Sequence, residues 1–140
     1  MDDSLTSQSV PEFTLDLVVV DCPSALALAG FYSTVLGWQV EKGSTDEWAT
    51  LVPPGGGVSV EQPDGRAALA FQQVANYVAP TWPVGTHPQQ FHLDISVVDI
   101  DASERVVLAA GATVHEHQPS QDRGFRVFLD PAGHPFCLIR

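Results

Sequence analysis

The residues best suited to chemistry in this sequence lie in two short stretches. The first, FHLDISVVD at residues 91–99, places His92 two positions before Asp94. Side chains alternate across a strand, so the two would share a face, and a nearby carboxylate can tune an imidazole for acid–base work near neutral pH. The second, PFCLIR at residues 135–140, holds Cys137, whose thiol would need a lowered pKa to act as a nucleophile. We therefore take His92, Asp94 and Cys137 as candidate catalytic residues.

The same side chains also have structural explanations, which the sequence leaves open. His92 could be a hydrogen-bonded imidazole that does no chemistry. Cys137 stands among apolar residues, as packed free thiols commonly do. Asp94 and Asp16, which holds the matching place in an earlier stretch, could be solvated charges or a carboxylate pair that binds a cation.

Composition excludes several classes of partner. The chain has 140 residues and a formal net charge of −11, and it contains no cluster of Lys or Arg. We therefore expect neither nucleic acid nor an anionic membrane surface as a partner. The acidity favours either solubility or a cationic ligand. No apolar run approaches the length needed to span a bilayer. The polar N-terminus does not resemble a secretory signal, so we expect a cytoplasmic protein whose two cysteines are free thiols.

The chain repeats itself. FTLDLVVVD at residues 13–21 resembles FHLDISVVD at 91–99, and each stretch predicts a strand. A predicted helix follows each, at 23–36 and 102–110, with a glycine after it. We expect Asp21 to cap the first helix, and Asp101 with Glu104 to form a capping box on the second. Further strands are predicted at 37–43, 47–53, 57–62 and 68–74, and at 112–118, 124–130 and 135–140.

These patterns predict one α+β domain, residues 1–140, built from two βαβββ modules at 13–78 and 91–140 with a linker at 79–90. In both leading strands the odd-numbered residues are apolar and should pack on the helices, whereas the even-numbered ones form a more polar face. Thr14 then occupies the place in the first module that His92 occupies in the second.

Three segments resemble the vicinal oxygen chelate superfamily, which includes glyoxalase, bleomycin-resistance and extradiol dioxygenase proteins. They are ALALAGFYSTVLGW (25–38), FHLDISVVDID (91–101) and FLDPAGHPFCLIR (128–140). The resemblance is greatest to the glyoxalase-like branch. It implies curved mixed sheets that enclose a ligand cleft, a homodimer, and, in metal-dependent members, ligands from the first and last strands of each module.

Carried over position by position, the resemblance implies an incomplete metal site. His92 fits the first-strand ligand of the second module, but Thr14, a poor ligand, matches it in the first. Cys137 stands where a Glu is expected, and the last ligand position falls near Ala70, with Gln72 as the alternative. We therefore favour no metal. If one binds, we expect His92, Gln72 and Cys137 to hold zinc, nickel, iron or manganese.

The favoured function is a metal-independent cleft protein that binds a small organic molecule and either sequesters or converts it. The alternatives are a metal-dependent enzyme of the glyoxalase type and an interaction domain with a vestigial cleft. Any enzyme would be a lyase, isomerase or dioxygenase of that type. The candidate ligand-binding residues are Thr14, Asp16, Trp38, Trp48, Gln72 and Trp82; core packing is the alternative role for Trp38 and Trp48.

Overall fold

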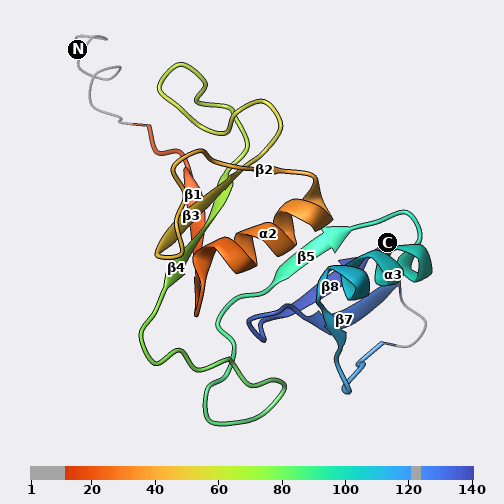
Figure 1. Ribbon diagram of the computed structural model, residues 1–140. Coiled ribbons are helices and arrows are strands. Elements are labelled where there is room, and N and C mark those ends of the chain that lie inside the picture. Colours follow the sequence, from red (N-terminus) through yellow and green to blue (C-terminus); the bar gives the residue numbers. More distant parts are fainter. Residues whose placement is uncertain (1–11, 121–123) are drawn as a thin grey trace, which may run out of the picture.

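The two modules form two sheets with the same strand order in a computed structural model that describes residues 12–120 and 124–140 (Figure 1). In each sheet the leading strand lies at one edge, parallel to the last strand of its module. The first sheet, in the order β1-β4-β3-β2, contains β1 (Leu17–Cys22), β2 (Gln39–Val40), β3 (Trp48–Val52) and β4 (Ala68–Gln73). The second, in the order β5-β8-β7-β6, contains β5 (Leu93–Ser96), β6 (Thr113–Val114), β7 (Phe125–Leu129) and β8 (Pro135–Ile139). The predicted α+β architecture is confirmed, although neither sheet closes.

The helices follow the leading strands as predicted, but other residues cap them. Helix α2 (Ala25–Leu36) begins at Ser24, whose hydroxyl accepts a hydrogen bond from the Ala27 amide, and it ends at Gly37 with φ 71°. Helix α3 (Ile100–Ala110) begins at Asp99. Asp21 does not cap α2 because β1 continues through it to Cys22.

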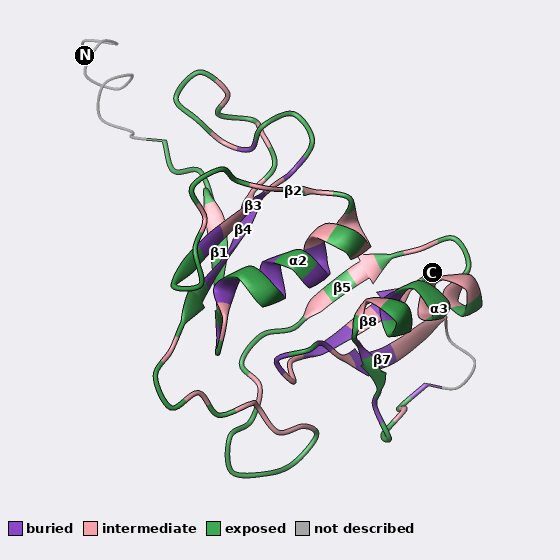
Figure 2. Cartoon of the chain, in the orientation of Figure 1, coloured by how far each residue is buried: buried purple, intermediate pink, exposed green. Residues whose placement is uncertain are grey.

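One core joins the modules. Helix α2 lies between the two sheets, and its buried face carries Phe31 and Tyr32 (Figures 1 and 2). The Tyr32 ring stacks on Phe71 of β4 at 5.7 Å and meets Phe136 of β8 edge-on at 6.1 Å. Because the same side chain packs against both sheets, the two modules bury their apolar faces together.

The predicted strand at 57–62 is wrong. Gly55, Gly56 and Gly57 all have positive φ, and the Gln62 side chain donates to the carbonyl oxygens of Gly55 and Gly57. These local hydrogen bonds take the place of strand pairing. The strands predicted at 37–43 and 112–118 shorten to β2 and β6, two residues each.

The register predicted for the repeat is also wrong, by three residues. Counted back from the helix caps Ser24 and Asp99, the equivalent of His92 is Leu17 rather than Thr14. An odd shift exchanges the two faces of a strand. In β1 the even-numbered Val20 and Cys22 therefore pack on the core, as the odd-numbered Leu93, Ile95 and Val97 do around β5.

The residues before Leu17 lie outside β1, although the Asp16 carbonyl accepts a hydrogen bond from the Ala68 amide of β4. Phe13, Thr14, Leu15 and Asp16 are all exposed, and so is Phe91 in the second module, which corrects the expectation that the odd-numbered phenylalanines pack on the helices. In the part of the chain that the structure describes, no helix is long and apolar enough to cross a membrane.

Candidate functional site

His92, Asp94 and Cys137 lie together on the exposed face of the second sheet. Strands β5 and β8 are parallel neighbours, and their register places Asp94 beside Cys137. His92 Nε2 lies 3.3 Å from Asp94 Oδ1, with the two side chains 45% and 48% exposed. One imidazole nitrogen, one carboxylate oxygen and the sulfur all lie within 4.8 Å of one another. Tertiary structure thus brings together three side chains from the two chemistry-bearing stretches.

The surroundings of Cys137 favour the protonated thiol over the thiolate that a nucleophile needs. Burial of the thiol, together with the charge of Asp94 and a hydrogen bond to it, raises the pKa of Cys137 to about 11. At neutral pH the sulfur therefore keeps its proton. The Asp94 carboxylate then lies between a thiol and an imidazole, an arrangement that suits proton transfer by His92.

The donor set of this cluster is chemically suited to zinc. Zinc accepts imidazole, carboxylate and thiolate ligands at about 2.0–2.3 Å in tetrahedral geometry. The spacing of the three ligand atoms, all within 4.8 Å, requires only small movements to reach such distances. The Cys137 thiol would have to lose its proton, as metal binding requires.

The first module supplies no matching set. In the first module, the positions equivalent to Asp94 and Cys137 hold Val19 and Ala70, which pair across β1 and β4. Neither Val19 nor Ala70 has a ligand atom. Gln72 lies in the first sheet, where its Nε2 donates to Asp21 Oδ1 at 2.9 Å, so it is not part of the His92 cluster.

A cavity of about 620 Å³ lies beside this cluster, between the modules. Strand β1, the segment after β4, the segment before β5 and the turn before β8 all contribute to its wall. Half of the lining residues are valine, leucine, proline or phenylalanine, including Val18, Val20 and Val74. His92 also lines it, so the cavity and the cluster share this residue.

Three hydrogen bonds that cross between the modules fix one wall of the cavity, called here the deep wall. The Tyr32 hydroxyl donates to Asp130 Oδ2 at 2.7 Å, and the Tyr77 hydroxyl donates to the Ala132 carbonyl at 2.8 Å. His134 Nε2 lies 2.7 Å from the Asp21 carbonyl oxygen. Each of these contacts joins one module to the other, so the wall is held by the same interactions that hold the modules together.

Burial dominates the electrostatics of this wall. It raises the pKa of Asp130, although the hydrogen bond from Tyr32 acts in the opposite direction. It also raises the pKa of Tyr32 well above its usual value. We did not predict Tyr32, Tyr77 or Asp130 as site residues. The only signal for them was the DPAG turn at 130–133, which does not reveal which side chains meet it.

The tryptophans expected to bind ligand lie elsewhere. Trp38 packs partly on the core and carries the Arg66 guanidinium over its ring at 5.7 Å. Trp48 donates from Nε1 to the Thr50 hydroxyl at 3.0 Å. Trp82 in the linker packs edge-on against His115 and His117. None of the three tryptophans lines the cavity between the modules, and neither do Thr14, Asp16 or Gln72.

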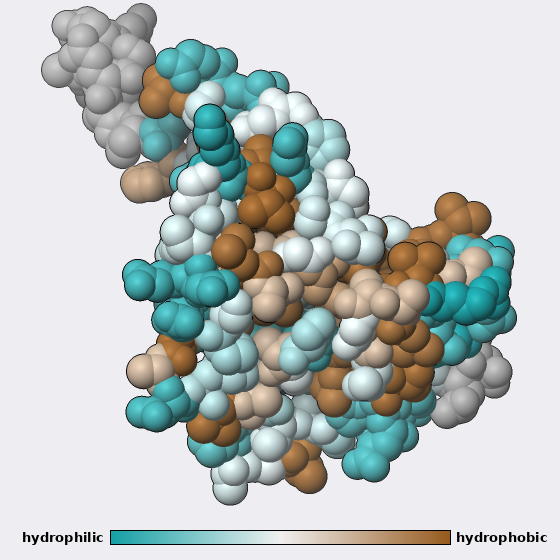
Figure 3. Space-filling view, viewed as in Figure 1, coloured by the Kyte–Doolittle hydropathy of each residue, from teal (hydrophilic) through white to brown (hydrophobic). Residues whose placement is uncertain are grey.

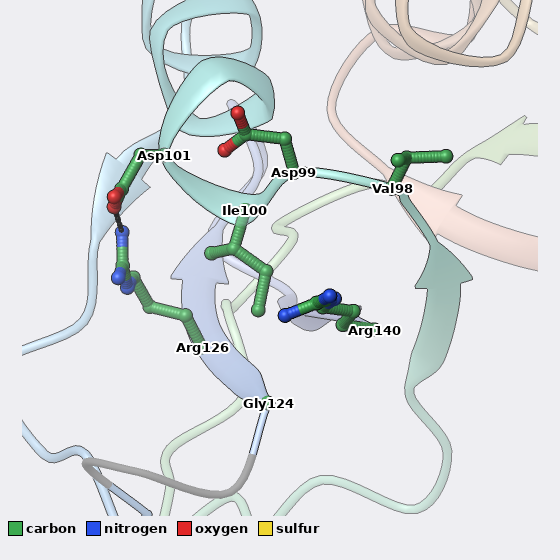
Figure 4. Close-up of a pocket in the computed structure, with 7 residues that line it drawn as sticks. All are labelled: Val98, Asp99, Ile100, Asp101, Gly124, Arg126 and Arg140. Carbon is green, nitrogen blue, oxygen red and sulfur yellow. Dashed lines mark hydrogen bonds and ion pairs between the residues drawn. The ribbon is translucent and has the colours of Figure 1, made fainter.

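A second hollow lies at the start of α3, and one of the two arginines in its wall is engaged in ion pairs. Its wall includes Arg126 and Arg140 (Figure 4). The Arg126 guanidinium contacts Asp101 at 3.1 Å and Glu104 at 2.9 Å, so the predicted capping-box residues hold this arginine instead. These carboxylates neutralise the arginine and leave it poorly suited to binding an anion.

The fold and this site define a protein of paired βαβββ modules, the architecture of the vicinal oxygen chelate superfamily. The family model for the glyoxalase-like domain matches residues 17–139, and the chain belongs to that family. No curated protein matches the chain.

Solved structures agree on the fold. A glyoxalase/bleomycin resistance protein/dioxygenase family enzyme from Burkholderia phytofirmans PsJN is 17% identical, with a TM-score of 0.62 over 90% of this chain and 97% of that one. A possible glyoxalase from Bacillus cereus is 12% identical, with a TM-score of 0.63 over 92% and 100%. A glyoxalase-related enzyme from Fulvimarina pelagi is 19% identical, with a TM-score of 0.59 over 91% and 88%. At these identities the similarity establishes the fold alone.

Proposed function

We propose that this glyoxalase-like protein binds a small organic molecule in the cavity between its modules and needs no metal to do so. The observation that carries the proposal is the cavity itself, whose volume of about 620 Å³ lies within the range of small-molecule sites. Its wall combines apolar side chains, half of the lining residues, with polar groups that internal hydrogen bonds hold in place, a composition that suits such a site.

His92 and Asp94 supply the chemistry if the bound molecule is converted. His92 reaches both the cavity and the Asp94 carboxylate, so it can move a proton to or from a ligand while Asp94 orients the ring. This supports a lyase or isomerase reaction that begins with proton transfer. We place the protein in the cytoplasm, where Cys22 and Cys137 would stay free thiols, as they are in the structure.

A variant that fills the cavity tests the proposal. Val78 lines the cavity and is 57% exposed, so Val78→Trp would occupy its volume without disturbing the core. Small molecules that raise the melting temperature of the wild type should lose that effect in this variant, because a ligand stabilises only the form that binds it.

Val60→Trp is the matched control, since Val60 is 93% exposed and does not line the cavity. It should respond to ligands as the wild type does. Hits that stabilise Val78→Trp and the wild type equally, or a library without hits, would contradict cavity binding.

The alternative is a zinc-dependent activity, favoured by the spacing of the donor atoms in the His92 cluster. His92, Asp94 and Cys137 would hold the ion, and a bound divalent metal would polarise a substrate oxygen. Elemental analysis of protein equilibrated with zinc and then desalted distinguishes the two proposals. Under the metal-independent proposal, no stoichiometric zinc is retained.

Variants assign any zinc that is retained. Under the alternative, one equivalent stays on the wild type and is lost from His92→Ala and Asp94→Ala. Gln72→Ala is the control and should keep it, because Gln72 lies in the other sheet. Zinc retained equally by His92→Ala would place the metal elsewhere.

We also propose a homodimer. Strands β1 and β5 lie at the edges of their sheets, and next to them Phe13 is 91% exposed and Phe91 is 87% exposed. Apolar surface also extends over α2 and toward α3 (Figure 3), where Leu26 and Val106 are exposed. Open strand edges beside large exposed apolar side chains are typical of surfaces that another chain covers.

A further inference from the structure

The charged side chains that line the cavity between the modules are carboxylates. Among its described lining residues, Asp21 and Asp130 are acidic and none is a lysine or arginine. The net charge of −11 adds a negative field at longer range. An anionic ligand would therefore meet no lysine or arginine among these residues, and the basic side chains of the lining are the histidines His87, His92 and His134.

The hydrogen-bond donors of the deep wall are already used within the protein. The hydroxyls of Tyr32 and Tyr77 donate to Asp130 and to the Ala132 carbonyl. His134 Nε2 lies 2.7 Å from the Asp21 carbonyl, which can only accept, so Nε2 must carry the proton. The Asp21 carbonyl thus fixes the tautomer of His134, and the Nε2 proton is already donated within the protein.

An acceptor beside the cavity is left without a donor. Gln89 lines the cavity, and its Oε1 is buried and accepts no hydrogen bond from the part of the chain that the structure describes. A buried polar atom without a partner is costly, and a ligand that donates a hydrogen bond to Gln89 after a movement of its side chain toward the cavity would remove the cost.

From these observations we infer that the ligand of the cavity is a hydrophobic amine, with a positively charged, hydrogen-bond-donating ammonium group on an apolar body. Its apolar body would contact Val18, Val20 and Val74, and its ammonium group would meet the acceptors and the negative field of Asp21. This inference rests on the proposed function, since it assumes that the cavity binds a small molecule.

The test compares ligands that share a body and differ in charge. Three bodies, phenyl, indolyl and naphthyl, are each offered as the ethylamine, the ethanol and the acetate, with affinities measured by calorimetry at neutral pH and low salt. We expect the amine to bind at least about tenfold more tightly than the alcohol of the same body, and the acetate to bind most weakly.

Asp21→Asn should reduce the preference for the amine over the alcohol to less than about threefold and leave the affinity for the alcohol unchanged. Asparagine keeps an oxygen that can accept the hydrogen bond from Gln72. Asp16→Asn removes an exposed carboxylate outside the cavity and should keep the wild-type preference.

The outcomes separate this inference from the proposed function. Alcohols that bind as tightly as amines, or acetates that bind more tightly, would overturn the inference while the cavity remains a binding site. An unchanged preference in Asp21→Asn would also overturn it. If none of the nine compounds binds, the proposed function and this inference fail together.

Discussion

At the scale of single residues, the most consequential arrangement is a buried carboxylate held by a tyrosine. Asp130 accepts the Tyr32 hydroxyl at Oδ2 and the amides of Ala132 and His134 at Oδ1. All its partners are donors, which is what an ionised carboxylate requires when it is buried. The bond from Tyr32 crosses between the modules, so one hydroxyl contributes both to the stability of the fold and to the shape of the cavity wall.

Tyr32→Phe should lower the free energy of unfolding by about 1–3 kcal/mol at neutral pH, because it leaves one oxygen of a buried carboxylate unpaired. Loss of the hydrogen bond raises the already raised pKa of Asp130 further, since that bond favours the ionised form. The folded variant therefore binds a proton more readily than the folded wild type. The stability difference should shrink as the pH falls through the folded pKa of Asp130.

Urea unfolding of both proteins at several pH values between neutral and acidic checks this prediction. A loss that stays constant across this range would mean that Tyr32 acts through packing alone.

At the scale of the elements, the pairing of each leading strand with the last strand of its module determines which side chains lie next to each other. The register of β5 on β8 brings Asp94 to Cys137, whereas the register of β1 on β4 brings Val19 to Ala70. The modules are alike in topology and different in chemistry. Among the described residues, the cluster of His92, Asp94 and Cys137 lies in the second module alone.

Two glycines associated with α2 should respond in opposite directions to alanine. Gly37 ends the helix at φ 71°, where a Cβ is unfavourable, so Gly37→Ala should cost about 1 kcal/mol. Gly30 lies within the helix, and a Cβ added there meets nothing within 4 Å. Gly30→Ala should therefore stabilise the protein by about 0.5–1 kcal/mol.

The midpoints of thermal or urea unfolding of the two variants give the comparison. Because Gly30 lies inside α2 and Gly37 at its end, a shift of the same sign in both would contradict the helix end described for α2.

At the scale of the whole molecule, two modules share one core and leave the outer edges of their leading strands open. Helix α2 contacts both sheets and covers the apolar face that each module turns toward the core. The apolar residues beside the strand edges have no such cover within one chain. A second copy of the chain is the occupant that we propose.

Phe13→Glu should shift the protein from dimer to monomer, because it replaces a large apolar side chain that the second copy would bury with a charged one, and Phe13 does not line the cavity. Val60→Glu, at a similarly exposed site away from the strand edges, is the control and should remain a dimer. Sedimentation velocity or light scattering measures the mass in solution. A monomeric wild type would contradict the proposal outright.

Much of the fold was predictable because its signals are local. The strands and helices of the repeat, the glycines that end the helices and the DPAG turn depend on neighbouring residues, and these predictions agree with the structure. The strand predicted at 57–62 failed because side-chain hydrogen bonds of Gln62 favour a glycine-rich loop there. The match of Thr14 to His92 failed because valine-rich strands align almost as well when shifted by three residues.

The candidate site was likewise predictable from the sequence only in part. His92, Asp94 and Cys137 are recognisable from residue type and strand alternation, since side chains on one face of a strand or on paired strands must lie close together. The cavity depends on how two modules dock, and Tyr32, Tyr77, Asp130 and His134 meet there across long sequence separations. Sequence alone determined the modules and the two stretches that carry His92, Asp94 and Cys137, because these follow from local periodicity. Only tertiary packing decided which donors are consumed, which acceptors remain and where a ligand has room.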